Sequence, residues 1–190
     1  MGSVTPSPPI RIAILVVDEP LPSVVERLGR FEAIFTSMFE AAAKSLNPPQ
    51  TLGSQLTITA HDVVLGDPAT AYPDPETIDA VLITGSRHSA YAEDDWIVRL
   101  TAFTRRLLDE NRVRVIGVCF GHQIVARALG AKVATSPYGW ELSITEMELT
   151  EKGKTVFGAE KVVSACMFRL KSDVWERVEA THILGLRKIP

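Results

Sequence analysis

The chain has 190 residues, of which 46% are hydrophobic and 23% are charged, and its formal net charge at pH 7 is -3. This length suits one domain with a substantial core and is short for two. Because the charges are nearly balanced and form no long run of one sign, they exclude an electrostatic case for nucleic acid or an anionic membrane as partner. We therefore expect a small molecule as the partner.

The cysteine content and the N-terminal residues bear on the cellular compartment in which the protein is expected. The two cysteines, Cys119 and Cys166, do not resemble a disulfide framework and fit a reducing environment. Residues 1–9 are rich in Pro and Ser and have no signal-peptide pattern, and no apolar run approaches the roughly 18 residues of a membrane span. We expect a cytoplasmic protein with a disordered lead at 1–9 and one domain at 10–190.

The first half of the chain predicts three strands and a helix. Residues 10–18 form a continuous β-branched apolar run, which is typical of a strand covered on both faces and therefore central in its sheet. Residues 24–46 carry apolar side chains at three- and four-residue spacing, which predicts one amphipathic helix that Asn47-Pro48-Pro49 ends. The patterns at 55–64 and 78–85 predict two more strands.

The second half continues the alternation. Asp94 and Asp95 precede an apolar helical stripe, residues 112–118 predict another buried strand, and residues 121–130 predict a helix that Gly130 closes. Strands that alternate with helices imply the α/β class, an open, mostly parallel sheet with helices on both faces. Beyond Lys132, short alternating segments predict a small antiparallel ribbon.

A cysteine between two glycines follows the strand predicted at 112–118. In Gly117-Val118-Cys119-Phe120-Gly121 the spacing is the cysteine form of the nucleophile elbow, a strand-to-helix turn so tight that side chains two residues away would collide. Ligands of open α/β sheets bind at the carboxyl ends of the strands, where Cys119 falls. We therefore interpret Cys119 as a nucleophile rather than an ordinary buried thiol.

The predicted turn favours thiol chemistry in two ways. A thiol at a helix N-terminus lies at the positive end of the helix dipole, which favours the thiolate. The next backbone N–H, that of Phe120, points to where the oxyanion of a tetrahedral intermediate would form. No spacing of Cys and His supplies four zinc ligands, so we expect neither a metal nor an organic cofactor.

With GVCFGHQIVARALG at 117–130, the chain resembles the class I glutamine amidotransferase-like family, especially the free-standing branch that includes the plant γ-glutamyl peptidases. The segments at 83–91, 94–96 and 138–153 also look like that branch, and the resemblance covers roughly residues 10–150. It implies a flavodoxin-like fold and a thiol hydrolase. In that reaction a cysteine attacks the γ-carbonyl of glutamine or of a γ-glutamyl compound and forms a thioester, which water hydrolyses.

The resemblance also implies site residues. Cys119 matches the nucleophile, and the backbone N–H of Phe120, with one from Gly85 or Ser86, matches the oxyanion donors. Gln123 matches the position that touches the bound glutamyl group. The implied partner is thus a small molecule, glutamine or a γ-glutamyl compound, and the oligomeric state stays open.

The chain departs from the family near residue 190. The segment THILGLRKIP, 181–190, resembles the strand that leads into a Gly-His-Pro-Glu type motif, whose His is the family's general base. Arg187-Lys188-Ile189-Pro190 stands where that His should follow, so we expect the domain to be incomplete at its C-terminus. Two alternatives therefore stay open: a catalytically inactive binding or regulatory protein, and a redox protein that uses Cys119 as a reactive thiol.

The four histidines of the chain are the candidates for a substitute base. His122 is expected to pack beneath the elbow helix, and His61 and His182 are expected to be structural. His88, in the loop after the strand at 78–85, lies close enough to the predicted site to be conceivable as a base. Cys166, in an apolar stretch, is expected to belong to the core.

Overall fold

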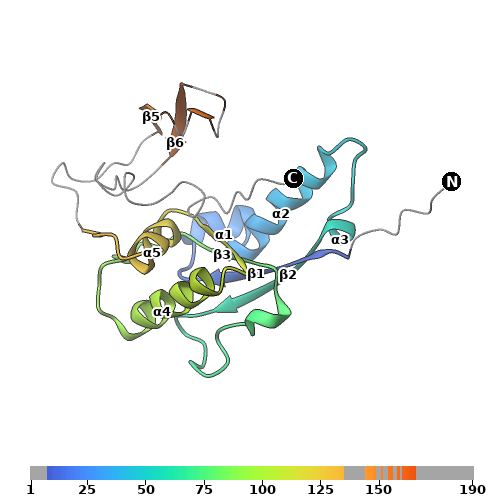
Figure 1. The fold of residues 1–190 in the computed structure, drawn as a ribbon. Helices are drawn as coiled ribbons and strands as arrows, with labels where there is room; N and C mark the ends of the chain where they lie inside the picture. Colours follow the sequence, from blue (N-terminus) through green and yellow to red (C-terminus); the bar gives the residue numbers. More distant parts are fainter. Residues whose placement is uncertain are drawn as a thin grey trace.

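The computed structural model describes residues 8–134, 144–148, 151, 154–155, 158 and 160–165 (Figure 1). Its main elements are β1 (Ile10–Val16), α1 (Pro22–Leu28), α2 (Phe31–Lys44), α3 (Leu52–Gln55), β2 (Leu56–Asp62), the 3-10 turn η1 (Pro75–Thr77), β3 (Ala80–Ile83), α4 (Asp95–Glu110), β4 (Arg114–Gly117), α5 (Phe120–Ala128), β5 (Ile144–Glu148) and β6 (Lys161–Ala165).

Strands β1 to β4 form an open sheet in the order β2-β1-β3-β4, and every neighbouring pair is parallel. In this register Ile14 of β1 lies between Ala60 of β2 and Leu82 of β3. Parallel strands need crossover connections, and α2 and α4 lie in two of these connections. The α/β class predicted from the sequence is confirmed, and so is the central position of β1.

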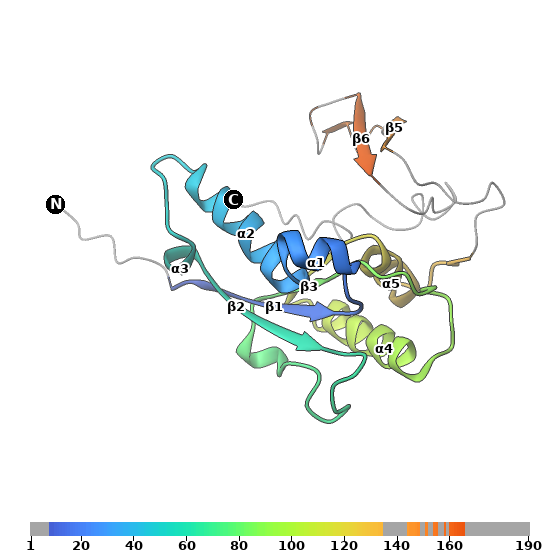
Figure 2. The same ribbon diagram turned by 180° about the vertical axis from the view of Figure 1, so that it is seen from behind.

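Helices cover both faces of the sheet, with α4 and α5 on one face and α2 on the other (Figures 1 and 2). Because successive side chains of a strand point to opposite faces, β1 contributes to a core on each side. Ala13 and Leu15 belong to the core beneath α4 and α5, which includes Ile97, Leu100, Phe120 and Ile124. Ile12 and Ile14 belong to a second core on the opposite face, with Phe35 of α2. The continuous apolar run of β1 is thus explained by burial on two sides.

The single helix predicted over residues 24–46 is wrong in one respect, since the structure has two helices there. Gly29 lies between α1 and α2 with φ +82° and ψ -171°, a backbone conformation that is essentially restricted to glycine and that ends α1. Phe31, Phe35 and Phe39 pack against the sheet as expected. Met38, another apolar residue of the segment predicted as a helix, is 60% exposed.

The strand predicted at 112–118 is confirmed as β4, but it is not buried on both faces. Val115 is 4% exposed, whereas Ile116 is 39% exposed. Ile116 pairs with Leu82 and so faces the side of α2, which packs over β1 at the middle of the sheet. Among the described strands, β4 pairs with β3 alone and so lies at the edge of the sheet, away from the helix that covers its middle. The Ile116 side chain therefore stays accessible.

The ribbon predicted beyond Lys132 is confirmed. Strands β5 and β6 pair antiparallel, with Ile144 opposite Ala165 and Met147 opposite Val162. Within the described ranges, no helix has the length and apolar character needed to cross a membrane.

Replacement of Ile14 by Ala tests the central role of β1. Ile14 is fully buried, and its truncation should lower the free energy of unfolding by about 2–5 kcal/mol. Ile10→Ala, on the same strand at a position 42% exposed, is the matched control and should cost about 1 kcal/mol or less. Urea unfolding of both variants measures the difference, and equal losses would contradict this account of the core.

Candidate active site

Cys119 lies between the end of β4 and the start of α5, in a backbone conformation that L-residues rarely adopt. Its φ is 52° and its ψ is -105°. Such a conformation costs of order 1–3 kcal/mol and persists only where the surroundings enforce it. Here the Val118 N–H donates to the Ile83 carbonyl at 3.0 Å and the Gln123 N–H donates to the Cys119 carbonyl at 3.2 Å. The turn is therefore fixed on both sides of the thiol.

The two glycines of the motif allow this turn by leaving room for the backbone. A Cβ on Gly117 would lie 2.5 Å from the carbonyl carbon of Gly121 and 2.6 Å from the backbone nitrogen of His122. A Cβ on Gly121 would lie 2.8 Å from the Cβ of Ile83 and would also overlap its carbonyl oxygen. A Cβ essentially never lies this close to an atom it is not bonded to, so the crowding expected from the sequence is present at both positions.

The proposed oxyanion donors come from two neighbouring strand ends. A Cβ built on Gly85, two residues beyond β3, would lie 3.6 Å from the Cβ of Cys119. Ser86 follows and is 7% exposed. Phe120 is the first residue of α5, where backbone N–H groups have no partner within the helix. The structure thus brings Gly85, Cys119 and Phe120 together.

Gln123 is also near the elbow, at a buried position. It lies in the first turn of α5, the residue is 6% exposed, and its N–H donates to the Cys119 carbonyl. A role in contacting a glutamyl group remains a prediction. Cys119 itself is half-buried.

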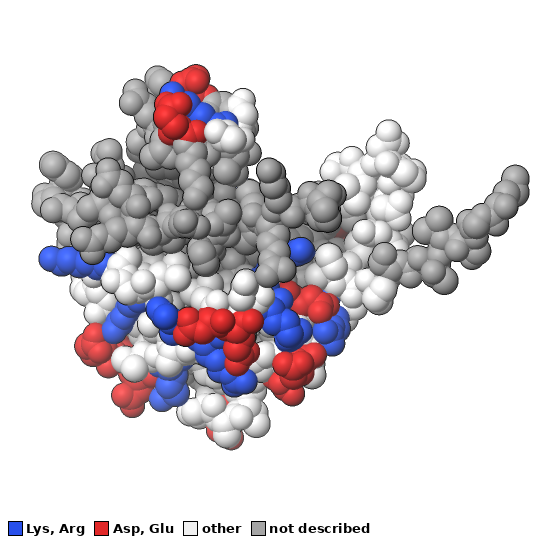
Figure 3. Space-filling view, viewed as in Figure 1, with Lys and Arg blue, Asp and Glu red and all other residues white. Residues whose placement is uncertain are grey.

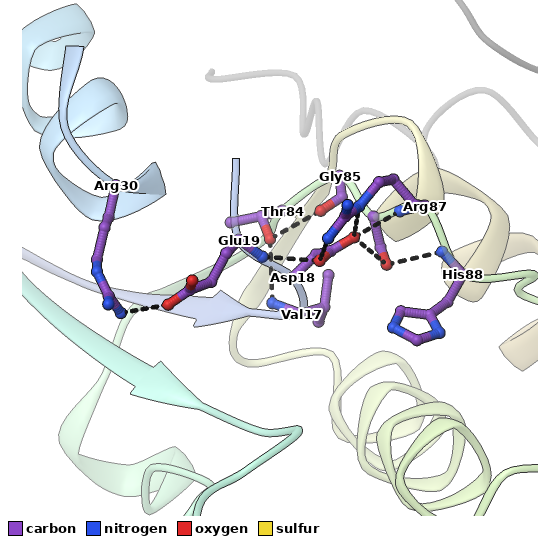
Figure 4. Close-up of polar contacts among 9 residues, drawn as sticks. Val17, Asp18, Glu19, Arg30, Thr84, Gly85, Arg87 and His88 are labelled. Carbon is purple, nitrogen blue, oxygen red and sulfur yellow. Dashed lines mark hydrogen bonds and ion pairs between the residues drawn. The ribbon is translucent and has the colours of Figure 1, made fainter. Parts of the chain in front are cut away.

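A carboxylate that the sequence analysis missed lies at the same edge of the sheet. Asp18, two residues beyond β1, accepts hydrogen bonds from the Arg87 N–H at 2.8 Å, from Arg87 Nε at 3.1 Å and from the Ser86 hydroxyl at 3.3 Å (Figure 4). Its other oxygen accepts from Arg87 Nη2 at 2.9 Å and from the Glu19 N–H at 2.8 Å. Asp18 therefore joins the end of β1 to the loop after β3.

The Asp18 carboxylate stays ionised despite its burial. Its side chain is 8% exposed, and burial alone would raise the pKa of Asp18. The hydrogen bonds from Arg87 and from the Glu19 N–H outweigh burial and hold this pKa well below its usual value. A signal was present in the sequence: Asp18 follows a buried strand at the carboxyl edge, where sites of such sheets lie.

Two of the described histidines, His88 and His122, lie near the elbow. The ring of His88 packs edge-on against Trp96 at 5.2 Å between ring centroids, and Trp96 stacks on Phe120 at 5.7 Å. His88 thus belongs to the neighbourhood of the elbow. His122, in α5, is half-buried, and burial lowers its pKa, which favours the neutral ring.

His61 lies at the edge of the four-stranded sheet opposite to the elbow. It is in β2, which is separated from β4 by β1 and β3, a spacing of about 14 Å at 4.8 Å per strand. Its ring shares a hydrogen bond of 3.2 Å with the Thr59 hydroxyl, and burial lowers its pKa. These contacts support the structural role expected for His61.

Several predicted features fall outside the described residues: Cys166, His182 and the segment 187–190. Within the part of the chain that the structure describes, no group of three or more His, Cys, Asp and Glu side chains is placed to hold a metal ion.

An open parallel sheet with a cysteine at a strained strand-to-helix turn defines an α/β protein of the nucleophile-elbow type. The family model of glutamine amidotransferase class-I matches residues 50–176. A glutamine amidotransferase-like protein of Schizosaccharomyces pombe is 33% identical over 155 residues, 80% of this chain and 60% of that protein. Gamma-glutamyl peptidase 4 of Arabidopsis thaliana is 38% identical over 116 residues, 59% of this chain and 46% of that protein. The chain belongs to the class-I glutamine amidotransferase family.

A solved structure supports the fold. The crystal structure of a glutamine amidotransferase from Thermotoga maritima superposes with a TM-score of 0.56 at 18% identity, covering 81% of this chain and 58% of that one. The match of this chain thus spans 60% and 46% of the lengths of the two relatives above and 58% of the solved chain.

Substitution of Gly121 by Ala tests the crowding at the elbow. The added methyl group would meet the backbone of Ile83, so the free energy of unfolding should fall by about 1–3 kcal/mol. Gly53→Ala is the control, because nothing lies within 4 Å of a Cβ there. Urea unfolding compares the two variants; a Gly121→Ala protein as stable as Gly53→Ala would contradict the tight turn.

Proposed function

We propose that the protein is a thiol hydrolase that cleaves the γ-amide of glutamine or of a γ-glutamyl compound. The observation that carries the proposal is the elbow: Cys119 is held at φ 52° beside Gly85, at the carboxyl edge of the sheet. A nucleophile in this position is exposed to a substrate and close to backbone donors from two loops. The family membership and a relative named gamma-glutamyl peptidase support the substrate class.

The proposed reaction has two stages. The Cys119 thiolate attacks the γ-carbonyl carbon, a C–S bond forms, and the carbonyl oxygen becomes an oxyanion. The C–N bond then breaks, and ammonia or an amine leaves with a proton. Water attacks the resulting thioester, which releases the γ-carboxylate and returns the thiol. Neither stage requires a metal or an organic cofactor.

The roles of the neighbouring residues follow from this reaction. The N–H of Phe120, with that of Gly85 or Ser86, would bind the oxyanion, since Phe120 directly follows the thiol and the loop of Gly85 packs beside it. Gln123 would support the glutamyl group from the first turn of α5. The thiol proton needs an acceptor, and His88 is the imidazole that the described chain places on the loop after β3.

We also propose a small-molecule partner in the cytoplasm rather than a nucleic acid or a membrane. Basic and acidic side chains are interspersed over the described part of the face shown in Figure 3, with no area of one sign. Several are paired, such as Arg105 with Asp109 and Arg106 with Glu110 on α4. A surface of mixed sign gives no attraction for a polyanion.

A second candidate is a binding or regulatory protein that keeps the scaffold without turnover. Arg187-Lys188-Ile189-Pro190, where the family's His motif would follow, favours it. The two candidates differ in one measurable respect, because a regulatory protein would bind glutamine or a γ-glutamyl compound without releasing an amine.

Cys119→Ala tests the proposed nucleophile. Loss of the thiol removes the covalent stage, so release of ammonia from glutamine, or of the aniline from a γ-glutamyl anilide, should fall by at least about 10³-fold. Cys166→Ala, the other cysteine of the chain, is the control and should retain the wild-type rate. An unchanged rate in Cys119→Ala would refute the assignment, and binding without any release by the wild type would favour the regulatory candidate.

A further inference from the structure

The loop after β3 is held between the ends of its two neighbouring strands. We call residues 85–93 the oxyanion loop, because its first residues supply a proposed oxyanion donor. The strand order places β3 between β1 and β4, so Asp18 after β1 and Cys119 after β4 lie on opposite sides of this loop. On the Cys119 side the contact is close packing at Gly85; on the Asp18 side it is a set of hydrogen bonds.

The hydrogen bonds to Asp18 hold both backbone and side chains of the oxyanion loop. The carboxylate accepts from the Arg87 N–H, from two nitrogens of the Arg87 guanidinium and from the Ser86 hydroxyl (Figure 4). The Ser86 hydroxyl in turn accepts from the His88 N–H at 3.0 Å. Three consecutive residues after Gly85 are thus oriented by one buried carboxylate.

Thr84 strengthens the same junction from within the sheet. Thr84 is fully buried, its N–H donates to the Leu15 carbonyl at 3.1 Å, and its hydroxyl accepts from the Val17 N–H at 3.2 Å. These contacts continue the pairing of β1 with β3 past the ends of both strands. Consequently the position of Asp18 relative to Gly85 is set by the sheet itself.

The far end of the oxyanion loop is fixed by the helix that begins at the elbow. Nη1 of Arg127, in the last turn of α5, donates to the carbonyls of Ala90 at 2.9 Å and Ala92 at 2.7 Å. Nη2 of Arg127 pairs with Glu93 at 2.6 Å. The loop is therefore anchored at its start by Asp18 and at its end by α5, and the first anchor lies next to the proposed donors.

We propose that Asp18 is a positioning residue for the oxyanion hole: by fixing Ser86 and Arg87, it sets the direction of the N–H groups at the start of the loop toward Cys119. This inference rests on the proposed function. Oxyanion donors are effective only when they are preorganised where charge develops, and a displaced donor loses most of its effect. Asp18 need not touch the substrate to act in this way.

The structure offers a matched control at the opposite end of the same two strands. Asp79, before β3, accepts from the Arg11 N–H at 2.9 Å and from Arg11 Nε and Nη2 at 3.0 and 2.7 Å. It thus repeats the contacts of Asp18 with Arg87, at the amino edge of the sheet instead of the carboxyl edge. Asp79→Asn disturbs a similar ion pair without touching the oxyanion loop.

The experiment compares wild type, Asp18→Asn and Asp79→Asn in their reaction with a glutamine-mimicking diazo-ketone, with the label mapped to Cys119 by peptide mass. An Asn amide cannot accept from all the Arg87 donors, so the oxyanion loop should lose its fixed direction. We expect the limiting rate of labelling to fall about 10-fold or more in Asp18→Asn, at an unchanged half-saturating concentration. Asp79→Asn should match the wild type in both quantities.

Two further readouts separate positioning from general damage. Reaction of Cys119 with a general thiol reagent should be the same in all three proteins, because access to the thiol is unchanged. Amide hydrogen exchange at Arg87 and His88 should be faster in Asp18→Asn and unchanged in Asp79→Asn. Arg87→Met, which alters a side chain 66% exposed, serves if Asp18→Asn does not fold, and it should also slow labelling.

The possible results distinguish failure of the proposed function from failure of the positioning role of Asp18. A wild type that is not labelled, although its thiol is accessible, overturns the proposed function and this inference with it. A labelled wild type with the same limiting rate in folded Asp18→Asn, or in Arg87→Met where Asp18→Asn is unfolded, overturns the positioning role of Asp18 alone. Slower labelling in Asp79→Asn equal to that in Asp18→Asn would also overturn it, since the effect would then come from general destabilisation.

Discussion

The strained backbone of Cys119 is the constraint on which the site depends. A residue with a Cβ at positive φ is unfavourable in isolation, and here it is enforced by the end of β4, the start of α5 and the Ile83 carbonyl. Burial of the β3 and β4 side chains in one core holds these elements together, with Val81, Ile83, Val115 and Ile124 each nearly inaccessible. The energy that keeps the thiol at the edge of the sheet is thus supplied by packing beneath it.

The parallel direction of the strands explains why the loops after β1, β3 and β4 converge. In a parallel sheet all carboxyl ends lie at one edge, so residues distant in sequence become neighbours: Asp18, Gly85 and Cys119 follow β1, β3 and β4 in turn. Each loop contributes a different kind of group: a buried carboxylate, backbone N–H groups and a thiol. The order of strands, with β3 in the middle, decides which groups face one another.

Local patterns predicted the parts of the molecule that depend on local physics. The β-branched run at 10–18 predicted a central strand, and the Gly-x-Cys-x-Gly spacing predicted the tight turn, because both effects arise within a few residues. The division of the helix at Gly29 was missed because apolar spacing continues across it, although the glycine was visible. The exposure of Ile116 and the hydrogen bonds between Asp18 and the loop after β3 depend on strand order, which the one-dimensional pattern does not contain.

The glycines around Cys119 differ in what their replacement would disturb. At residues 117 and 121 an added carbon meets backbone, so selection there acts on the amount of folded protein. At Gly85 the same carbon would rest at ordinary van der Waals distance from the Cys119 Cβ, which costs the fold little. It would, however, lie beside the Cβ of Cys119, at the position from which the proposed oxyanion donor comes. A related protein that no longer used the thiol could therefore lose Gly85 while it retained Gly117 and Gly121. Replacement of Gly85 alone would then mark a relative that kept the fold and lost the reaction.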